Sequence, residues 1–286
     1  MLEARTVKSL LSRLNWIHTP ALVLFHVTAL VAVVATRPRP IDIFLLVSLY
    51  LATGFGITVG FHRLITHRGF QTPRWVRNLL GFLGTASLQG SPVQWSLVHR
   101  RHHQLSDKPN DPHTPRRGFF YSHAGWILFR RTVEKNPQLV RDVVSEPFFR
   151  FLDIPGINIT PALSLAVLCW LAGGWQGVLW GVCLRTVLLW NATWSVNSFC
   201  HVIGSREFDT PDNSRNLWLV GLVALGEGWH NNHHARPRVA VHGIRWWQID
   251  LSWRVIQGLE MVGLARAIKR PRFVKGLDGD DLETEA

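Results

Sequence analysis

The chain has 286 residues, of which 47% are hydrophobic, with 14 His, 14 Trp, 3 Cys and a formal net charge of +12. Three cysteines exclude a disulfide framework, and the apolar and aromatic content excludes a disordered, collagen-like or low-complexity chain. The positive charge is typical of proteins that meet nucleic acid or an anionic membrane surface. The sequence carries no motif of a nucleic-acid-binding fold, so we expect a lipid bilayer and no nucleic acid as a partner.

The apolar residues are concentrated in four runs. Residues 16–36, 43–62 and 157–172 contain no Lys, Arg, Asp or Glu, and residues 174–201 contain only Arg185. Each run approaches the roughly 20 residues that a helix needs to cross a bilayer. Four buried helices of a soluble protein are the alternative, but such helices seldom lack charge on every face.

Short breaks between the runs predict two helical hairpins. Arg37–Pro40 separates the first two runs and Ala172–Gly174 the last two, and both breaks are rich in Pro or Gly. We therefore expect an all-α integral membrane protein with four transmembrane helices in two hairpins and a cytosolic helical cap. The expected single domain, residues 1–286, comprises helices at about 16–36, 41–61, 157–173 and 175–198, a cap of residues 62–156 and 202–277, and an acidic tail of residues 278–286.

The basic residues orient these helices. Residues 1–15 hold 3 Lys and Arg, residues 62–156 hold 14 and residues 202–286 hold 11, against 2 and 0 in the two breaks. The positive-inside rule then predicts a multi-pass protein with both termini and the cap in the cytoplasm. The first run is too long for the apolar core of a cleaved signal peptide. Residues 75–95 and 217–228 are weakly apolar and are expected to form in-plane or re-entrant helices.

Three clusters hold eight of the 14 histidines. Two of them share the spacing H-x-x-H-H, which on an α-helix places three imidazoles within a sector of about 100°. The remaining cluster is the pair His62 and His67, which are five residues apart. On a regular helix this spacing is poor for binding one metal ion and favours ligation of two metal ions from a helix end. The clusters are His62 and His67; His99, His102 and His103; and His230, His233 and His234.

Each cluster follows an apolar segment, so all three are expected at one depth near the cytoplasmic surface. Asn197 and His201, four residues apart at the end of the last run, form a fourth element, although Asn197 could instead bond a neighbouring carbonyl. Surface or capping histidines would explain one cluster but not three on one membrane face. Of the other histidines, His18 and His26 are expected to be plain helix residues, and His113, His123 and His242 hydrogen-bonding residues near the site.

Nine imidazoles exceed the needs of one ion and indicate a dimetal site in the cap. Imidazole suits iron, zinc, copper and nickel, but the H-E-x-x-H of a zinc protease is missing from these clusters. Two iron ions with open positions would suit O₂ activation. Ligating imidazoles need partners on their other ring nitrogen. The carboxylates near the clusters are Asp107, Asp111, Glu207, Asp209, Asp212 and Glu227, with Asp111 and Glu227 the foremost candidates.

Four longer segments resemble the membrane-bound fatty acid desaturases, specifically the Δ9 group that includes stearoyl-CoA desaturases and cyanobacterial stearoyl-lipid 9-desaturases. They are GITVGFHRLITHRGFQTP (56–73), HRRHHQLSDKPNDPHTPRRGFFYSHAGW (99–126), NATWSVNSFCHVIG (191–204) and GEGWHNNHHARP (226–237). The resemblance covers about residues 15–265. It implies nine catalytic, metal-ligating histidines, His62, His67, His99, His102, His103, His201, His230, His233 and His234, with Asn197 acting through water. It also implies that Gln89, Trp95 and Trp194 flank the acyl chain, where interfacial anchoring is the alternative for the tryptophans.

The resemblance implies an O₂-dependent oxidoreductase that introduces a cis double bond, most often Δ9, into a saturated C16 or C18 chain carried as acyl-lipid or acyl-CoA. Its cofactors would be two Fe²⁺ ions with O₂ as co-substrate, and its electron donor an external ferredoxin or cytochrome b5 type protein. A diiron membrane hydroxylase of an alkane, sterol or carotenoid is the nearest alternative, because hydroxylation shares the first hydrogen abstraction. A zinc-dependent membrane hydrolase or transporter is a more distant one.

Overall fold

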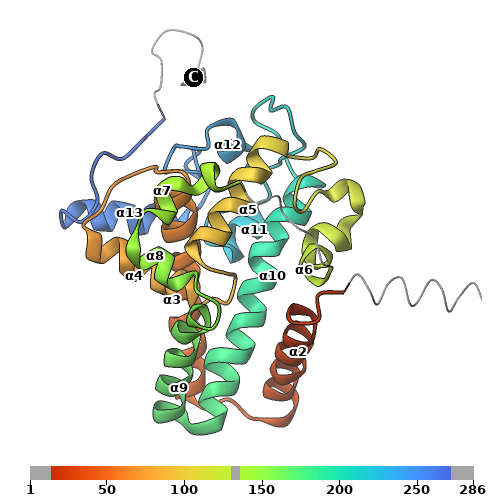
Figure 1. Cartoon of the computed structure of the whole chain (residues 1–286), viewed down its shortest axis with the longest axis vertical. Helices are drawn as coiled ribbons and strands as arrows, with labels where there is room; N and C mark the ends of the chain where they lie inside the picture. The colour runs from red at the N-terminus through yellow and green to blue at the C-terminus, as the bar shows by residue number, and fades with distance from the viewer. Residues whose placement is uncertain (1–13, 130–135, 272–286) are drawn as a thin grey trace, which may run out of the picture.

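The computed structural model describes residues 14–129 and 136–271, and the predicted acidic tail lies outside the described residues. The described residues form helices and isolated β-bridges, without a β-strand among them. Long helices stand together at one end of the molecule, and the shorter helices gather at the other (Figure 1). This matches the predicted all-α class and the predicted division into long apolar helices and a helical cap.

The first half of the chain contains α2 (His18–Ala35), α3 (Pro40–Phe55), the π-helix η1 (Gly56–Thr66), α4 (Arg74–Thr85), α5 (Pro92–Leu105), η2 (Pro115–Arg117), η3 (Tyr121–Gly125) and α6 (Trp126–Leu128). The second half contains η4 (Pro137–Val140), α7 (Arg141–Val144), α8 (Pro147–Leu152), η5 (Ile157–Ile159), α9 (Thr160–Val178), η6 (Leu179–Leu184), α10 (Arg185–Ser198), η7 (Phe199–His201), α11 (Trp218–Val223), α12 (His230–Ala235) and α13 (Leu251–Met261).

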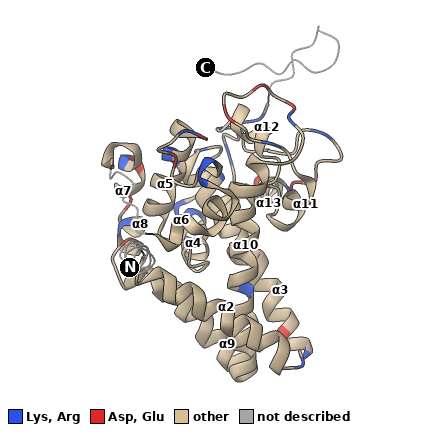
Figure 2. Ribbon diagram, turned by 90° about the vertical axis from the view of Figure 1, so that its right-hand side faces the viewer, with Lys and Arg blue, Asp and Glu red and all other residues tan. Residues whose placement is uncertain are grey.

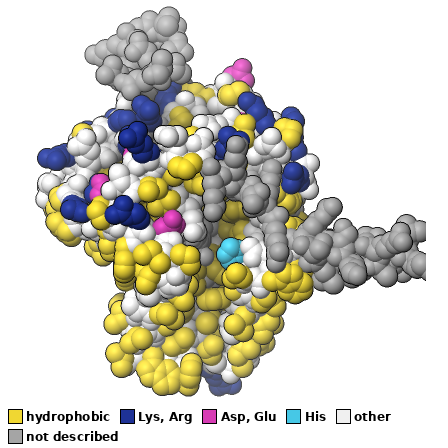
Figure 3. Space-filling view, viewed as in Figure 1, with side chains coloured by type: hydrophobic (Ala, Val, Ile, Leu, Met, Phe, Trp, Pro, Cys, Tyr) yellow, Lys and Arg dark blue, Asp and Glu magenta, His cyan; other side chains and the backbone are white. Residues whose placement is uncertain are grey.

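Within the described residues, three continuous helical stretches are long and apolar enough to cross a membrane: His18–Ala35, Pro40–Thr66 and Ile157–His201. Large apolar side chains are exposed along them, including Val34, Leu171 and Trp175. The surface of this end of the molecule is mostly hydrophobic, whereas most of the Lys and Arg lie toward the other end (Figures 2 and 3). An exposed apolar surface of this kind is stable in contact with lipid and suggests membrane association.

The third stretch is interrupted where the sequence predicts a break. Gly174 has φ 62° and ψ −154°, a conformation that glycine adopts without the steric cost of a Cβ. Beyond it the chain packs closely on the preceding helix: a Cβ at Gly177 would lie 2.5 Å from the carbonyl oxygen of Cys169, and one at Gly181 would lie 2.7 Å from its Sγ. Glycines thus let the end of α9 and η6 approach the part of α9 that contains Cys169 at short distance.

The two predicted breaks meet at the apolar end of the molecule. Arg39 Nη2 donates to Gly173 O at 2.5 Å and to Asp42 Oδ1 at 2.8 Å. Gln176 Nε2 also donates to Asp42, at 2.8 Å. The positive charge of Arg39, which ran against the positive-inside pattern, is therefore paired with a buried carboxylate.

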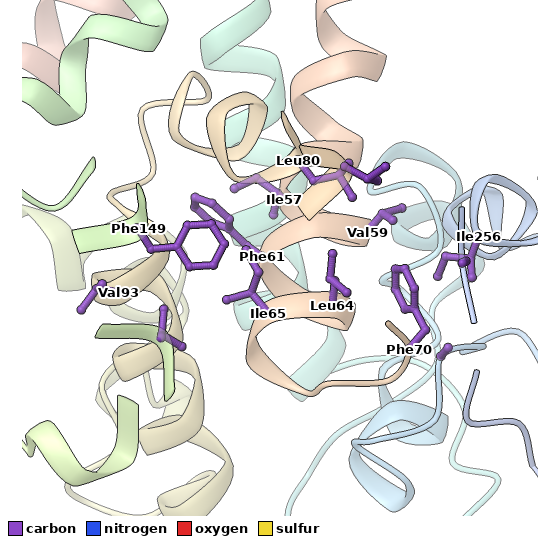
Figure 4. Close-up of a cluster of buried hydrophobic side chains, with 14 of the residues drawn as sticks. Ile57, Val59, Phe61, Leu64, Ile65, Phe70, Leu80, Val93, Phe149 and Ile256 are labelled. Carbon is purple, nitrogen blue, oxygen red and sulfur yellow. The ribbon is translucent and has the colours of Figure 1, made fainter. Parts of the chain in front are cut away.

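Segment η1 is the last part of the second apolar stretch, and each of its residues is buried. Its side chains Ile57, Phe61 and Ile65 join a core that includes Leu80 of α4 and Phe149 of α8 (Figure 4). The region predicted as an in-plane or re-entrant helix at 75–95 becomes α4 and the start of α5. At 217–228, only Trp218–Val223 is helical.

Packing of η1 on α4 requires glycine at position 56. A Cβ there would lie 2.3 Å from the backbone nitrogen of Gly84 and 2.5 Å from the carbonyl carbon of Leu83, and backbone atoms cannot move aside cheaply. Gly56→Ala is therefore expected to destabilise the protein by about 1–3 kcal/mol, seen as a lower thermal unfolding midpoint in detergent. The matched control is Gly258→Ala in α13, where a Cβ meets nothing within 4 Å and should stabilise the helix slightly. Equal midpoints for the two variants would contradict this account.

Candidate metal centre

Four segments bring the nine histidines together. The pair His62 and His67 lies at the end of η1, the second cluster on the last two turns of α5, and the third on α12. His201 ends the short η7 that follows α10. The imidazoles form two groups, and in each group the ligand atoms all lie within 4.8 Å of one another. The first group is His62, His67, His99, His103 and His233, and the second is His102, His201, His230 and His234.

In the first group, five Nε2 atoms converge on one point. The Nε2 atom of His99 lies 2.8 Å from that of His67 and 3.0 Å from that of His103. The Nε2 atom of His233 lies 3.0 Å from those of His103 and His62. For metal–nitrogen bonds of about 2.1 Å, ligands at right angles are about 3.0 Å apart, so these separations fit one metal ion.

Hydrogen bonds alone do not account for this contact. A neutral imidazole nitrogen carries either one hydrogen or one lone pair, yet the Nε2 atoms of His99, His103 and His233 each face two others. Burial, together with repulsion from neighbouring histidines, holds the pKa of these three well below its ordinary value. The rings are therefore neutral, and their lone pairs are available to a cation.

The second group has four imidazoles arranged around another point. The Nε2 atoms of His230 and His201 are 3.1 Å apart. Those of His102 and His234 are buried without any hydrogen-bond partner in the described chain. Buried polar nitrogens are normally satisfied, so two orphaned ones that share a group with two further imidazoles fit a metal ion.

The structure corrects the expectation for the first histidine pair. His62 and His67 were expected to serve two metals, but both belong to the first group, with ring centroids 4.8 Å apart. The reason is the π-helical conformation of η1. The N–H of His67 donates to the carbonyl of His62 at 3.0 Å, five residues back, which places positions five apart on one side.

The two H-x-x-H-H clusters are divided between the groups in opposite ways. His99 and His103 of α5 join the first group and His102 the second. In α12, His230 and His234 join the second group, whereas His233 joins the first. On a helix, positions four apart are 40° apart, whereas the third position lies 60° to the other side. Each cluster therefore supplies both groups.

Carboxylates bind the far nitrogens of four histidines. Asp111 Oδ1 lies 3.0 Å from Nδ1 of His102, and Glu227 Oε2 forms a short hydrogen bond with Nδ1 of His62. Both are the residues that the sequence put foremost. Asp107 contacts His201 Nδ1 at 3.1 Å and Asp212 contacts His234 Nδ1 at 2.6 Å. Glu207 and Asp209 pair with Arg245 and Arg206 instead.

These contacts fix which nitrogen faces the centre of each group. Burial would raise the pKa of Asp212, but hydrogen bonds, the strongest of them from His234, outweigh burial and hold that pKa below its ordinary value. The ionised carboxylate accepts the Nδ1 hydrogen, so Nε2 presents its lone pair. The same holds for Asp111, whose pKa is lowered by His102 against the effect of burial.

The sequence did not predict the ion pair between Arg63 and Glu227. Arg63, 1% exposed, donates Nη2 to Glu227 Oε1 at 2.9 Å and Nη1 to Asp250 Oδ2 at 2.9 Å. It also donates to the carbonyl of Ala240. The sequence offers only an arginine next to His62, because burial of that arginine and its partners far along the chain are properties of the fold.

The residues predicted to flank the acyl chain have different surroundings. Trp95 stacks on His99, with centroids 4.7 Å apart, and also contacts His62. Gln89 accepts from Thr193 Oγ1 at 3.0 Å, and Trp194 is buried against Trp190.

Asn197 lies partly buried on α10, one turn before His201. Both ring nitrogens of His242 are orphaned, and Nδ1 is 3.6 Å from Glu227, while His113 Nδ1 lies 3.9 Å from Asp111. His123 bonds Ser198 and Asn191, farther from the centre. His18 and His26 belong to α2, as expected.

Fold and site define a helical, membrane-associated protein with a buried centre of two imidazole groups. The fatty acid desaturase family matches residues 43–266, and the chain belongs to that family. It is 41% identical to the sn-1 stearoyl-lipid 9-desaturase of Anabaena variabilis over 90% of this chain and 94% of that protein. It is 39% identical to the sn-2 palmitoyl-lipid 9-desaturase of Nostoc sp. (strain 36) over 90% of both chains. The chloroplastic palmitoyl-monogalactosyldiacylglycerol delta-7 desaturase of Arabidopsis thaliana is 43% identical over 78% of this chain and 61% of its own.

Proposed function

We propose that this protein is a Δ9 desaturase of C16 or C18 chains esterified in membrane lipids, with iron at both imidazole groups. The observation that carries the proposal is the convergence of five and four histidines at the boundary between the apolar helices and the cap. The two cyanobacterial relatives are named as lipid 9-desaturases, which favours position 9 and an acyl-lipid over an acyl-CoA.

The residues present fit two iron ions. The nine imidazoles are the proposed ligands, with Asn197 reaching the second group through water. Two reduced iron ions held there would supply the activation of O₂ for the removal of two hydrogens from adjacent methylenes, with two external electrons and two protons completing the formation of two waters. The chain itself orients the ligands through its four carboxylates and excludes water by burial. Trp95, stacked on His99, closes one side of the centre and would position the acyl chain.

Four membrane-crossing segments in two hairpins are proposed for the apolar end. The break at Gly174 would divide the 45-residue stretch into two crossings of about the required length. Both termini would then lie with the cap on the cytoplasmic side, where most of the Lys and Arg are found (Figure 2).

A separate acidic carrier, of the ferredoxin or cytochrome b5 type, is proposed as the electron donor. Arg238 is exposed and is the last of the groups that, after burial, His62, Arg100 and His234, lower the pKa of His67. A basic surface at this point would attract an acidic protein to the part of the cap nearest the first imidazole group.

Expression in a bacterial host that lacks Δ9 monoenes, with an added donor system, tests the function. New cis-Δ9 C16 or C18 monoenes in membrane lipids, dependent on O₂, are expected. Comparison of the lipid and acyl-CoA pools at early times shows which pool is desaturated first. Hydroxylated chains without monoenes would favour the hydroxylase alternative, and product formation without O₂ would exclude the proposed oxidase chemistry.

A further inference from the structure

Arg185 is a buried cation in the apolar part of the molecule. It is the one charged residue of the run 174–201, and it is 0% exposed. No carboxylate of the described residues lies within 4.0 Å of it. Its hydrogen bonds are long, each 3.3 Å, and reach the carbonyls of Gly181 and Ala86 and the hydroxyl of Thr53. A charge in this environment is costly and usually has a function.

The guanidinium is also incompletely bonded. Its Nη2 has no partner, and neither has the buried hydroxyl of the next residue, Thr186. Within the described residues of the three apolar helices, these are the buried side-chain nitrogen and oxygen atoms left without a partner. Buried polar atoms of this kind normally hold ordered water. The unpaired Nη2 of Arg185 therefore indicates a bound water inside an otherwise apolar region.

This site lies on the side of α10 that contacts the turn carrying Gln89, one of the three residues expected along the acyl chain. Arg185 donates to the carbonyl of Ala86, Trp190 to the carbonyl of Ser87, and Thr193 to the side chain of Gln89. Three side chains of α10 thus hold the first part of the turn between α4 and α5, with Arg185 at Ala86 and Thr193 at the predicted acyl-contacting Gln89.

The depth of the site is set by Thr53, which accepts the Nη1 hydrogen bond. Thr53 precedes His62 by nine residues in one continuous helical stretch. Because the part from Gly56 onward is the π-helix η1, which rises less per residue than an α-helix, the two backbone positions are at most about 14 Å apart along the helix. This separation is comparable to the length of a C18 chain beyond a double bond at its middle.

We propose that Arg185 is the residue that limits the length of the acyl chain, by keeping a hydrated cation where the methyl end must stop. This rests on the proposed desaturase function and adds the chain-length limit to it. A longer chain would displace the water and leave the guanidinium without its last partner in apolar surroundings. The free-energy cost of leaving the buried guanidinium without this hydrogen bond exceeds the free energy gained by burying two more methylenes.

Removal of the charge tests the proposal. Arg185→Met and Arg185→Gln both remove it, and the glutamine keeps an N–H donor for Ala86. Cells that produce each variant are fed C16, C18 and C20 acids, and the monoenes are quantified with the iron content of the purified proteins. We expect the ratio of C20 to C18 monoenes to rise roughly tenfold, the binding gain from two further buried methylenes. Arg185→Lys, which keeps a cation, should retain the wild-type ratio.

The matched control is Arg254→Met, because Arg254 is exposed in α13 and its side chain hydrogen-bonds only Gln257 among the described residues. A wild-type ratio in both uncharged variants, at normal iron content, would overturn the proposal. The wild-type enzyme also tests it without any substitution, because C20 chains desaturated as fast as C18 chains would equally overturn it. If the wild type forms no monoenes at all, the proposed function fails, and that result is distinct from a failed length limit.

Discussion

His233→Ala is expected to lower desaturation more than about 100-fold while the protein remains in the membrane. The Nε2 of His233 lies 3.0 Å from those of both His62 and His103, so its loss opens the first imidazole group at its centre. Changes to the outer partners of a metal ligand typically cost 10–100-fold, and removal of the ligand itself costs more. Monoene content of the host lipids reports the activity, and iron per purified chain is expected to fall from two ions toward one.

His18→Ala is the matched control, since His18 is exposed at the start of α2. It should retain full activity and iron content. His230→Ala removes a member of the second group and should cause an equally deep loss of activity with the other iron released. Near-wild-type turnover by His233→Ala would contradict the proposed ligand role.

Arg63→Met is expected to lower the stability of the protein by about 3–5 kcal/mol, because it leaves two buried carboxylates, Glu227 and Asp250, without their cation. In a chain of this size that loss corresponds to a fall of roughly 10 °C in the unfolding midpoint. Differential scanning calorimetry of the detergent-purified protein would detect this fall in the unfolding midpoint. Glu227 also orients His62, so weaker iron retention should accompany the lower midpoint.

Arg254→Met serves again as the control for loss of an arginine, because its side chain is exposed. Arg63→Lys is expected to fall between the two, since lysine keeps the charge but cannot donate to both carboxylates in the same fork geometry. An unchanged midpoint for Arg63→Met would show that the two carboxylates do not depend on this cation.

Much of the architecture was readable from local patterns. Uncharged runs predicted the long apolar helices, and the Gly and Pro residues between them marked breaks that the structure has, including Gly174. These predictions succeed because helix formation and burial in lipid depend on the residues of the segment itself. The hydrogen bond between Asp111 and His102 was also predictable, because the two residues are only nine positions apart.

The division of the histidines between the two imidazole groups could not be predicted from local patterns. The regular-helix assumption separated His62 from His67, whereas the π-helical backbone of η1 joins them. Arg63 binds Glu227 and Asp250, which lie 164 and 187 positions further along the chain, so no local pattern reveals these contacts.

The sequence by itself determined that this protein is helical, that its apolar helices suit a membrane and that its histidines are numerous and spaced for metal, because hydropathy and helical periodicity are properties of short segments. Only the tertiary structure decided which five and which four imidazoles converge, which carboxylates orient them and how Arg185 comes to be enclosed among three elements. Those features arise from contacts between segments far apart in the chain, where packing and burial, rather than local propensity, set the geometry.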